Sequence, residues 1–219
     1  MYSVASATAD VVRDTGPGNA PEVSSFLASD EQITGFAYDP FTDHFFLRLA
    51  PGNVIRVVDR PARAVKREFE VKELPTTGGG DLAVKPRTGH LFLLDPNEPR
   101  VSELTRLGKW VRSFALAGLT GPADGIAYDS AHDRLLVLER GAPASIGIFD
   151  LEGRRTATLT LEHEVRASLA FDADAREIYA PLTATPGEIG VFDERGRLRR
   201  KFKDGSLIDV GTRSFVRVF

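Results

Sequence analysis

A unit of 43 to 46 residues occurs four times in this chain. Each copy contains a short apolar segment centred on an alanine, and successive alanines are 46, 44 and 43 residues apart: Ala37, Ala83, Ala127 and Ala170. A polar turn, a continuous apolar run, a loop and a second apolar run follow each alanine. A regular period of this length indicates a repeat architecture, in which each unit buries its apolar faces against its neighbours.

Each unit is predicted to form four short strands. The turn before the last strand ends in glycine in three copies, at Gly108, Gly153 and Gly196, whereas the first copy has Ala62-Arg63. Glycine accepts the left-handed backbone of a tight hairpin. Each last strand is centred on a large apolar residue: Phe69, Phe114, Leu159 and Phe202. Four antiparallel strands repeated at this period are typical of a β-propeller blade.

The strand chemistry favours the same architecture. Inner blade strands are covered on both faces, so they read as unbroken apolar runs, as Phe45–Leu47 and Leu135–Leu138 do. We expect the four repeated alanines on the strand nearest the crowded axis, where converging blades leave little room. The predicted fold class is therefore an all-β propeller of four-stranded antiparallel blades.

The two ends of the chain supply material for one more blade. Residues 22–28 resemble a last strand, with Phe26 in the repeating position, and residues 214–219 resemble a first strand. We expect four complete repeats plus a fifth blade closed by these N- and C-terminal strands, which removes free sheet edges. The alternative is part of a six-bladed ring. Residues 1–20 are predicted to be an N-terminal arm or an extra strand, and residues 21–219 a single propeller domain.

Composition limits the classes of partner. The chain has no cysteine, which excludes disulfides and thiolate ligands, and its net charge of −3 gives no general attraction to nucleic acid. The basic run Arg195–Lys203 is interpreted as a solvent-facing outer strand. No apolar run of 18 residues occurs, so no membrane span is expected. We expect no signal peptide in this chain, so the protein is either cytoplasmic or exported with its signal removed.

The third copy carries the clearest motif. It consists of Pro122, the segment Gly125–Asp129, an apolar strand over Leu135–Glu139, the segment Ile146–Asp150 and Gly153. This pattern resembles the NHL repeat and, more broadly, propellers of the regucalcin and gluconolactonase type. The resemblance covers about residues 33–205 and implies a propeller. It does not select one function, since such propellers serve as lactonases, lyases, protein-binding platforms and structural modules.

The chain departs from the enzymes of that group. Calcium-dependent lactonases of this type carry a glutamate on an early first strand, where this chain reads Ile33–Phe36. Related lyases and amidases use histidines around the channel. Here His44, His90 and His132 are expected in surface turns on the opposite rim, and only His163 is expected on the usual binding face. We therefore assign no catalytic residue.

Polar side chains are nevertheless expected on that binding face. It is formed by the loops that enter each first strand and the loops between second and third strands. Four carboxylates there could hold Ca²⁺, an ion that prefers oxygen ligands: Asp81, Asp95, Asp124 and Glu139. The alternative is that these acids cap turns. Four further residues are candidates for ligand binding: Asn53, Asn97, Arg140 and His163.

Two functions follow from this pattern. A regular repeat without a complete catalytic set favours a non-catalytic binding or scaffold propeller that engages a protein, peptide or glycan through its loop face. The alternative is a divalent-metal-dependent, lactonase-like hydrolase of small molecules, or a lyase, at the channel mouth with Ca²⁺ as its cofactor. The glycine-rich segment Glu73–Asp81 is expected to be a flexible loop at that mouth, because a strand rather than a lysine and helix follows it.

Overall fold

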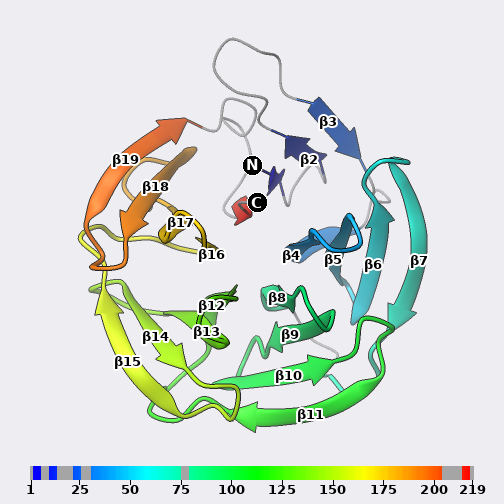
Figure 1. The fold of residues 1–219 in the computed structure, drawn as a ribbon, viewed down its shortest axis with the longest axis horizontal. Helices are drawn as coiled ribbons and strands as arrows, with labels where there is room; N and C mark the ends of the chain where they lie inside the picture. The colour runs from blue at the N-terminus through cyan, green and yellow to red at the C-terminus, as the bar shows by residue number, and fades with distance from the viewer. Residues whose placement is uncertain are drawn as a thin grey trace.

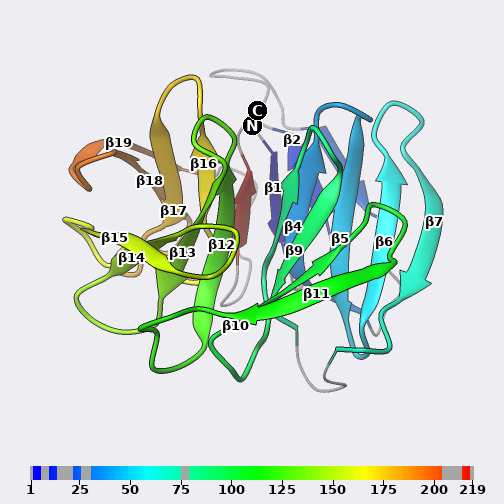
Figure 2. The ribbon, with the colours of Figure 1, turned by 60° about the horizontal axis from the view of Figure 1, so that its bottom comes forward.

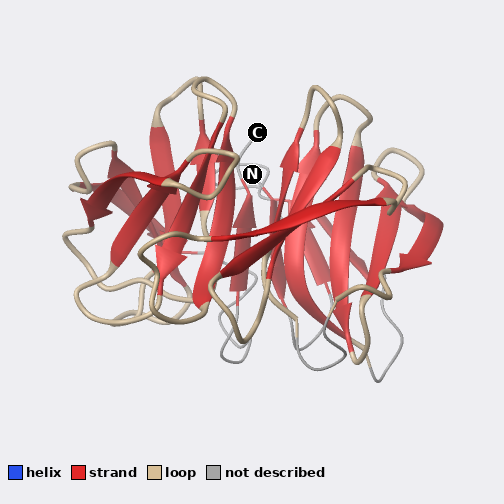
Figure 3. Ribbon diagram, turned by 90° about the horizontal axis from the view of Figure 1, so that it is seen from below, coloured by secondary structure: helices blue, strands red, loops and turns tan. Residues whose placement is uncertain are grey.

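The computed structural model describes residues 31–74 and 79–203, together with the backbone of strands at 2–5, 10–13, 22–25 and 214–217. Twenty strands in these ranges form five four-stranded antiparallel sheets. The sheets are arranged radially around a central axis (Figure 1). Figure 3 shows only strands, loops and turns in the described parts of the chain. The predicted all-β propeller is confirmed.

The four sequence copies form four blades, each with its strands in chain order from the axis outwards. We call these strands first to fourth. Blade 1 comprises β4 (Gln32–Asp39), β5 (His44–Ala50), β6 (Val54–Asp59) and β7 (Ala64–Glu70). Blade 2 comprises β8 (Leu82–Lys85), β9 (His90–Leu94), β10 (Arg100–Leu104) and β11 (Trp110–Ala115). Blade 3 comprises β12 (Ala123–Asp129), β13 (Arg134–Glu139), β14 (Ser145–Phe149) and β15 (Arg155–Thr160). Blade 4 comprises β16 (Ala170–Asp172), β17 (Glu177–Pro181), β18 (Glu188–Asp193) and β19 (Leu198–Lys203).

The fifth blade joins the two ends of the chain. Its order from the axis is β20 (Ser214–Arg217), β1 (Tyr2–Ala5), β2 (Asp10–Arg13) and β3 (Glu22–Ser25). The first strands contact one another in the cycle β4, β8, β12, β16, β20 and back to β4, so five blades close the ring. The expected closure by both termini is thus confirmed. Strands β1 and β2 lie within residues 1–20, and Phe26 falls outside the described residues.

The hydrophobic core lies between blades. Phe92 and Val101 of blade 2 pack in one cluster with Leu135 and Phe149 of blade 3, and comparable clusters join blade 1 to blade 2 and blade 3 to blade 4. Because each middle strand is covered on both sides, the unbroken apolar runs are buried throughout. The outermost strands contain only exposed and partly buried residues, as expected for strands covered on one side.

The hairpins between third and fourth strands fix the spacing of the blades. Gly153 has a φ of 80°, and the pairing of β14 with β15 shifts register between Ile148 and Phe149. A Cβ on Gly153 would lie 2.1 Å from the carbonyl oxygen of Ala115 in the preceding blade. Glycine is therefore required both for the left-handed backbone and for the close approach of neighbouring blades. The first copy meets the backbone demand with Arg63, whose φ is 50°.

The closest contacts near the axis involve glycines rather than the repeated alanines. A Cβ on Gly35 would lie 2.8 Å from the carbonyl oxygen of Gly80, and one on Gly125 would lie 2.8 Å from the amide nitrogen of Leu169. The four alanines are buried but border a cavity, described below. The four alanines lie on the first strands, as expected, and neighbouring blade backbones approach closely at the glycines two residues earlier, Gly35 and Gly125.

The strands run between two faces of the ring (Figure 2). The entry face carries the loops leading into the first strands and the loops between second and third strands. The turn face carries the third-to-fourth strand hairpins and the four-residue turns that follow the first strands, at 40–43, 86–89, 130–133 and 173–176. Across the described residues, no helix has the length and apolar character to cross a membrane.

Candidate functional site

Asp81, a predicted metal ligand on the entry face, is buried and ties two blades together. Its Oδ1 accepts a hydrogen bond from the amide of Leu82 (2.8 Å), and its Oδ2 accepts one from the amide of Ile126 in blade 3 (3.1 Å). Only 2% of the residue is exposed. Both carboxylate oxygens are therefore engaged by backbone groups of neighbouring first strands.

Beneath Asp81 lies Arg48, which sequence reasoning missed. Its side chain is fully buried, and its Nη1 donates to the carbonyl oxygens of Leu94 (2.6 Å) and Gly80 (3.2 Å). Burial lowers the pKa of Arg48 to about 10, against the opposing effect of Asp95 and Asp81. The guanidinium consequently stays charged at neutral pH. An arginine inside the apolar run FFLRL was the available signal.

The other three predicted metal ligands serve local contacts. Asp95 accepts hydrogen bonds at Oδ1 from the amides of Asn97 (2.9 Å) and Glu98 (3.0 Å), which caps its turn. Asp124 pairs with Arg140 at 2.8 Å, and Glu139 pairs with Arg155 at 2.6 Å. Within the described residues, no group of three or more His, Asp or Glu side chains is arranged to hold a metal ion. The structure thus places these carboxylates on one face without gathering them into a coordination sphere.

The four predicted ligand-binding residues divide into two pairs. Asn53 is buried and donates from Nδ2 to the carbonyl oxygen of Leu74 (3.1 Å), while Arg140 is held by Asp124. Asn97 and His163 are exposed. The structure brings none of the four into a described cavity, so their role in binding stays a prediction.

The glycine-rich segment is packed where it is described. A Cβ on Gly79 would lie 1.9 Å from Oγ1 of Thr34, and one on Gly80 would lie 2.4 Å from the carbonyl oxygen of Leu94. These glycines permit contact between blades 1 and 2, which corrects the expectation of a flexible loop for this end of the segment. Residues 75–78 lie outside the described residues.

The turn-face histidines are held by polar partners. His44 is buried rather than at the surface, with its Nε2 3.0 Å from Nζ of Lys66, and burial and then Lys66 lower its pKa. His90 contacts Glu103 (2.6 Å), and the exposed His132 contacts its neighbour Asp129 (2.8 Å). The expected turn position was wrong for His44 and His90, which are the first residues of β5 and β9, and His44 is also buried rather than at the surface.

A cavity of about 290 Å³ opens at the turn-face end of the channel. It lies where the first strands of the four repeats end, on the face opposite the predicted ligand residues. The alanines at the equivalent position of every repeat border it, and the aromatic residues Tyr38, Tyr128 and Phe171 stand among its walls. Among the described residues, its lining consists of Ala37, Tyr38, Pro40, Ala83, Val84, Pro86, Ala127, Tyr128, Ser130, Ala170, Phe171, Asp172, Ala173 and Asp174.

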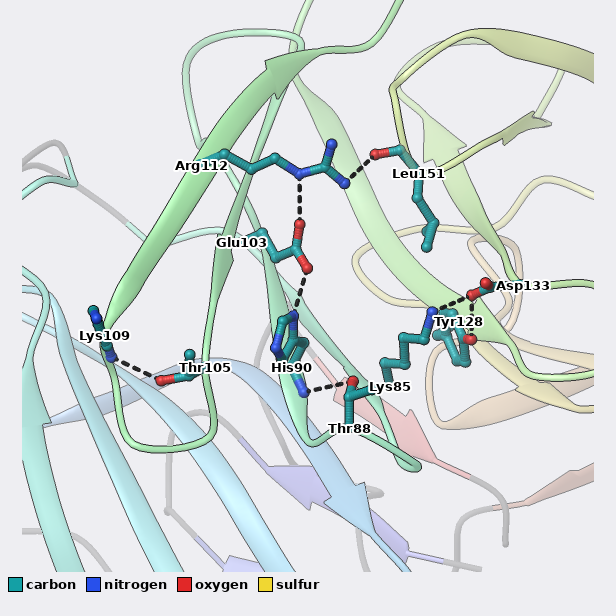
Figure 4. A network of polar contacts seen from close by, with 10 residues as sticks. All are labelled: Lys85, Thr88, His90, Glu103, Thr105, Lys109, Arg112, Tyr128, Asp133 and Leu151. Carbon is teal, nitrogen blue, oxygen red and sulfur yellow. Dashed lines mark hydrogen bonds and ion pairs between the residues drawn. The ribbon is translucent and has the colours of Figure 1, made fainter.

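Polar contacts fix the two tyrosines at this cavity. The hydroxyl of Tyr38 donates to Asp43 (2.7 Å) and that of Tyr128 donates to Asp133 (2.6 Å). Lys85 of blade 2 reaches Asp133 of blade 3 at 2.5 Å, and its Nζ lies 5.6 Å from the centroid of the Tyr128 ring (Figure 4). Burial, and then the hydrogen bond to Asp133, raise the pKa of Tyr128, so its hydroxyl remains a donor. The two rings are thus held in place by contacts within the chain.

Two large apolar side chains are strongly exposed on the same face. Phe41 is 77% exposed in the turn after β4, and Leu107 is 72% exposed in the hairpin between β10 and β11. An ion pair between Arg106 and Asp39 (2.9 Å) links these two turns. Among the described residues, these are the two most exposed large apolar side chains.

A polar chain on β9, β10 and β11 of blade 2 reaches blade 3 (Figure 4). Glu103 accepts from Nε of Arg112 (2.7 Å) and contacts Nδ1 of His90 (2.6 Å), while Nη2 of Arg112 donates to the carbonyl oxygen of Leu151 in blade 3 (2.8 Å). Burial alone would raise the pKa of Glu103, but the hydrogen bonds from His90 and Arg112 outweigh it and lower the pKa. Glu103 is therefore ionised and structural.

Comparison with known proteins identifies the fold. No protein-family model and no curated protein matches the sequence. A chain of a nidogen/laminin complex is similar in structure, with a TM-score of 0.66 and 15% identity over 98% of this chain and 96% of that chain. Hydrazine synthase of Kuenenia stuttgartiensis has a TM-score of 0.52 and 14% identity over 87% of this chain and 53% of that chain. The protein has a β-propeller fold.

Proposed function

We propose that this chain is a non-catalytic binding module that takes a segment of a protein or peptide partner on its turn face. The observation that carries the proposal is the cavity at the turn-face end of the channel, with Phe41 and Leu107 exposed on the same face. Exposed apolar side chains beside a concave site are typical of interaction surfaces. The likeness to a chain from a nidogen/laminin complex is compatible with this use of the fold.

The size of the cavity favours a partner segment over a free small molecule. Pockets for drug-sized ligands span about 300–1,000 Å³, and this one, at about 290 Å³, lies at the lower limit. Such a volume suits one anchoring side chain of a larger partner. The exposed Phe41 and Leu107 would then cover apolar groups beside that anchor.

The sequence alone favoured the loop face, here the entry face, and a protein, peptide or glycan ligand. On the entry face, backbone amides and arginines of this chain already engage four carboxylates: Asp81, Asp95, Asp124 and Glu139. These contacts support placing the proposed site on the turn face instead. No feature of the described residues favours the metal-dependent hydrolase or lyase. We retain membership of the NHL or regucalcin-type group as a proposal, supported by the motif of the third copy and the left-handed Gly153 in its hairpin.

A peptide-display selection tests the binding proposal. Peptides enriched on the wild-type protein would be measured against Phe41→Ser/Leu107→Ser on the turn face and against Asn97→Ser on the entry face. All three positions are exposed, so the variants should fold. We expect enriched peptides to lose about tenfold or more in affinity on the turn-face variant and to keep it on the entry-face variant. Failure to enrich any peptide, or sensitivity only to Asn97→Ser, would contradict the proposal.

A further inference from the structure

We propose that the turn-face cavity receives a single cationic side chain, a lysine or an arginine, from the partner. This inference rests on the binding function proposed above and specifies its chemistry. Among the described residues, the charged members of the cavity lining are Asp172, the last residue of β16, and Asp174 in the turn that follows. No basic residue belongs to this described part of the lining.

Asp172 differs from the aspartates at the same position of blades 1 and 3. Asp39 of blade 1 pairs with Arg106, and Asp129 of blade 3 pairs with His132 and Arg134. By contrast, neither Asp172 nor Asp174 forms an ion pair with any residue that the structure describes. Negative charge at the mouth of an apolar cavity attracts a cation, since low-dielectric walls concentrate the field.

The backbone keeps Asp172 in position without neutralising it. Its Oδ1 accepts hydrogen bonds from the amides of Asp174 (3.0 Å) and Ala175 (2.9 Å). Arg176, the basic residue of the same turn, is engaged by Glu194 at 2.8 Å on the outer side of the blade. The second carboxylate oxygen of Asp172 thus remains available to an incoming donor.

The walls suit the rest of a basic side chain. Lysine and arginine bury an apolar stem while presenting a charged end, and here the alanine methyl groups would contact the stem. Tyr38, Tyr128 and Phe171 offer aromatic rings, which attract cations. Lys85 of the neighbouring blade already lies over the Tyr128 ring, so an incoming cation would meet the rings of Tyr38 or Phe171.

The surroundings favour one cation over a polybasic segment. Arg87 is exposed in the turn after β8, next to the lining residue Pro86, and its charge acts on Tyr128. A second basic residue on the blade 2 side of the partner would face this arginine. We therefore expect one basic anchor flanked by neutral or apolar residues, the latter facing Phe41 and Leu107.

Methyl NMR of protein labelled with ¹³C at alanine methyl groups gives a readout located at the cavity. The probes are N-acetyl-arginine amide and N-acetyl-lysine amide, with N-acetyl-norleucine amide as the neutral control. We expect the cationic probes to shift the Ala37, Ala83, Ala127 and Ala170 signals in a saturable manner. Asp172→Asn/Asp174→Asn should bind the arginine probe about three- to tenfold more weakly, from loss of two partly exposed charge contacts. Asparagine at 172 still offers an acceptor for the turn amides, so this variant should fold.

Glu70→Gln, at an exposed position on the entry face, is the matched charge control and should bind the probe as the wild type does. Equal shifts with the norleucine probe, unchanged affinity in the double variant, or no shift at the four alanines would overturn the inference. The display selection separates the two proposals. Enriched peptides without a basic anchor would overturn the cation inference and leave the binding function standing, whereas no enrichment would overturn the function itself.

Discussion

Asp81 on the entry face and Asp172 on the turn face both lie at first strands of the ring but have different surroundings. On the entry face, Asp81 receives two backbone amides from adjacent first strands, and the guanidinium of Arg48 fills the space between blades 1 and 2. On the turn face, Asp172 and Asp174 stand at an open cavity and form no ion pair with described residues. Ion pairs join blades on the turn face as well, through Arg106 with Asp39 and Lys85 with Asp133, so the difference between the faces lies in Asp172 and Asp174.

This difference can be followed at one position of the repeat. The last residue of the first strand is an aspartate in three copies, Asp39, Asp129 and Asp172, and only Asp172 has no cationic partner among the described residues. An aspartate at the same position of the repeat is thus held by an ion pair in two copies and by backbone amides alone in a third. The next four predictions test that division, beginning with the largest effect.

Replacing Arg48 by alanine should cause the largest loss of stability. Asp81 and Asp95 would lose the buried cation, and two carbonyl oxygens would lose their donor. Removing one partner from a buried charged set costs about 3–5 kcal/mol. The measurement is the free energy of unfolding in urea. Arg87→Ala on the turn face, where the side chain is exposed, should stay within about 0.5 kcal/mol of the wild type. Equal losses in the two variants would remove the distinction between the faces.

Alanine at Gly153 should destabilise more than alanine at Gly118. Both glycines have left-handed backbones, with φ of 80° and 79°, but a Cβ on Gly153 would meet Ala115 while one on Gly118 has 3.4 Å to Arg155. Gly118→Ala should cost about 1 kcal/mol from the backbone alone. Gly153→Ala should cost about 2–3 kcal/mol, because steric overlap is added. Chemical denaturation of both variants gives the comparison, and matching values would show that the turn-face hairpins do not set blade spacing.

Stability should fall in acid through the acids that link blades. The pKa of folded Glu103 lies below the ordinary 4.5, so its stabilisation is present above that value and is lost as pH falls through the lower folded pKa. Glu103→Gln should lose about 1–2 kcal/mol at pH 7, with the gap to wild type narrowing below about pH 4.5. Thermal or urea unfolding across pH gives the profile. Asp172→Asn, by comparison, should change stability at pH 7 by less than about 0.5 kcal/mol. A gap for Glu103→Gln that is constant with pH would contradict the assignment.

The last prediction is that Ca²⁺ does not change the stability of the protein. The predicted ligands Asp81, Asp95, Asp124 and Glu139 are occupied by amides and arginines. We expect the same unfolding midpoint in chelator, in millimolar Ca²⁺ and in Mg²⁺. Ligands that bind the folded state raise the midpoint by mass action. A rise of the unfolding midpoint that is specific to Ca²⁺ would contradict this prediction. It would favour the metal-dependent hydrolase or lyase, with its site on the entry face.

The repeat made the fold predictable, because a period of 43 to 46 residues with four apolar strands leaves few architectures open. The site was much less predictable. Whether Asp81 is a metal ligand or an acceptor for Ile126 depends on a contact 45 residues away, which no local pattern records. The resemblance of the third copy to NHL-type propellers likewise favoured a site on the entry face, where such propellers usually bind. The cavity depends on how far apart Ala37, Ala83, Ala127 and Ala170 are held, a property of blade packing rather than of any one segment.

The pairing of β1 with β20 also has a consequence for biosynthesis. Tyr2 is aligned with Arg217 and Ala5 with Ser214, so the ring closes between strands more than two hundred residues apart. During synthesis on the ribosome, β1 can pair with β20 only after every other described strand has been made. Such late, sequence-distant pairing slows folding and exposes strand edges in the interval. We therefore expect truncation before residue 214 to yield a nascent chain that depends on chaperones, even though the four sequence repeats are all present.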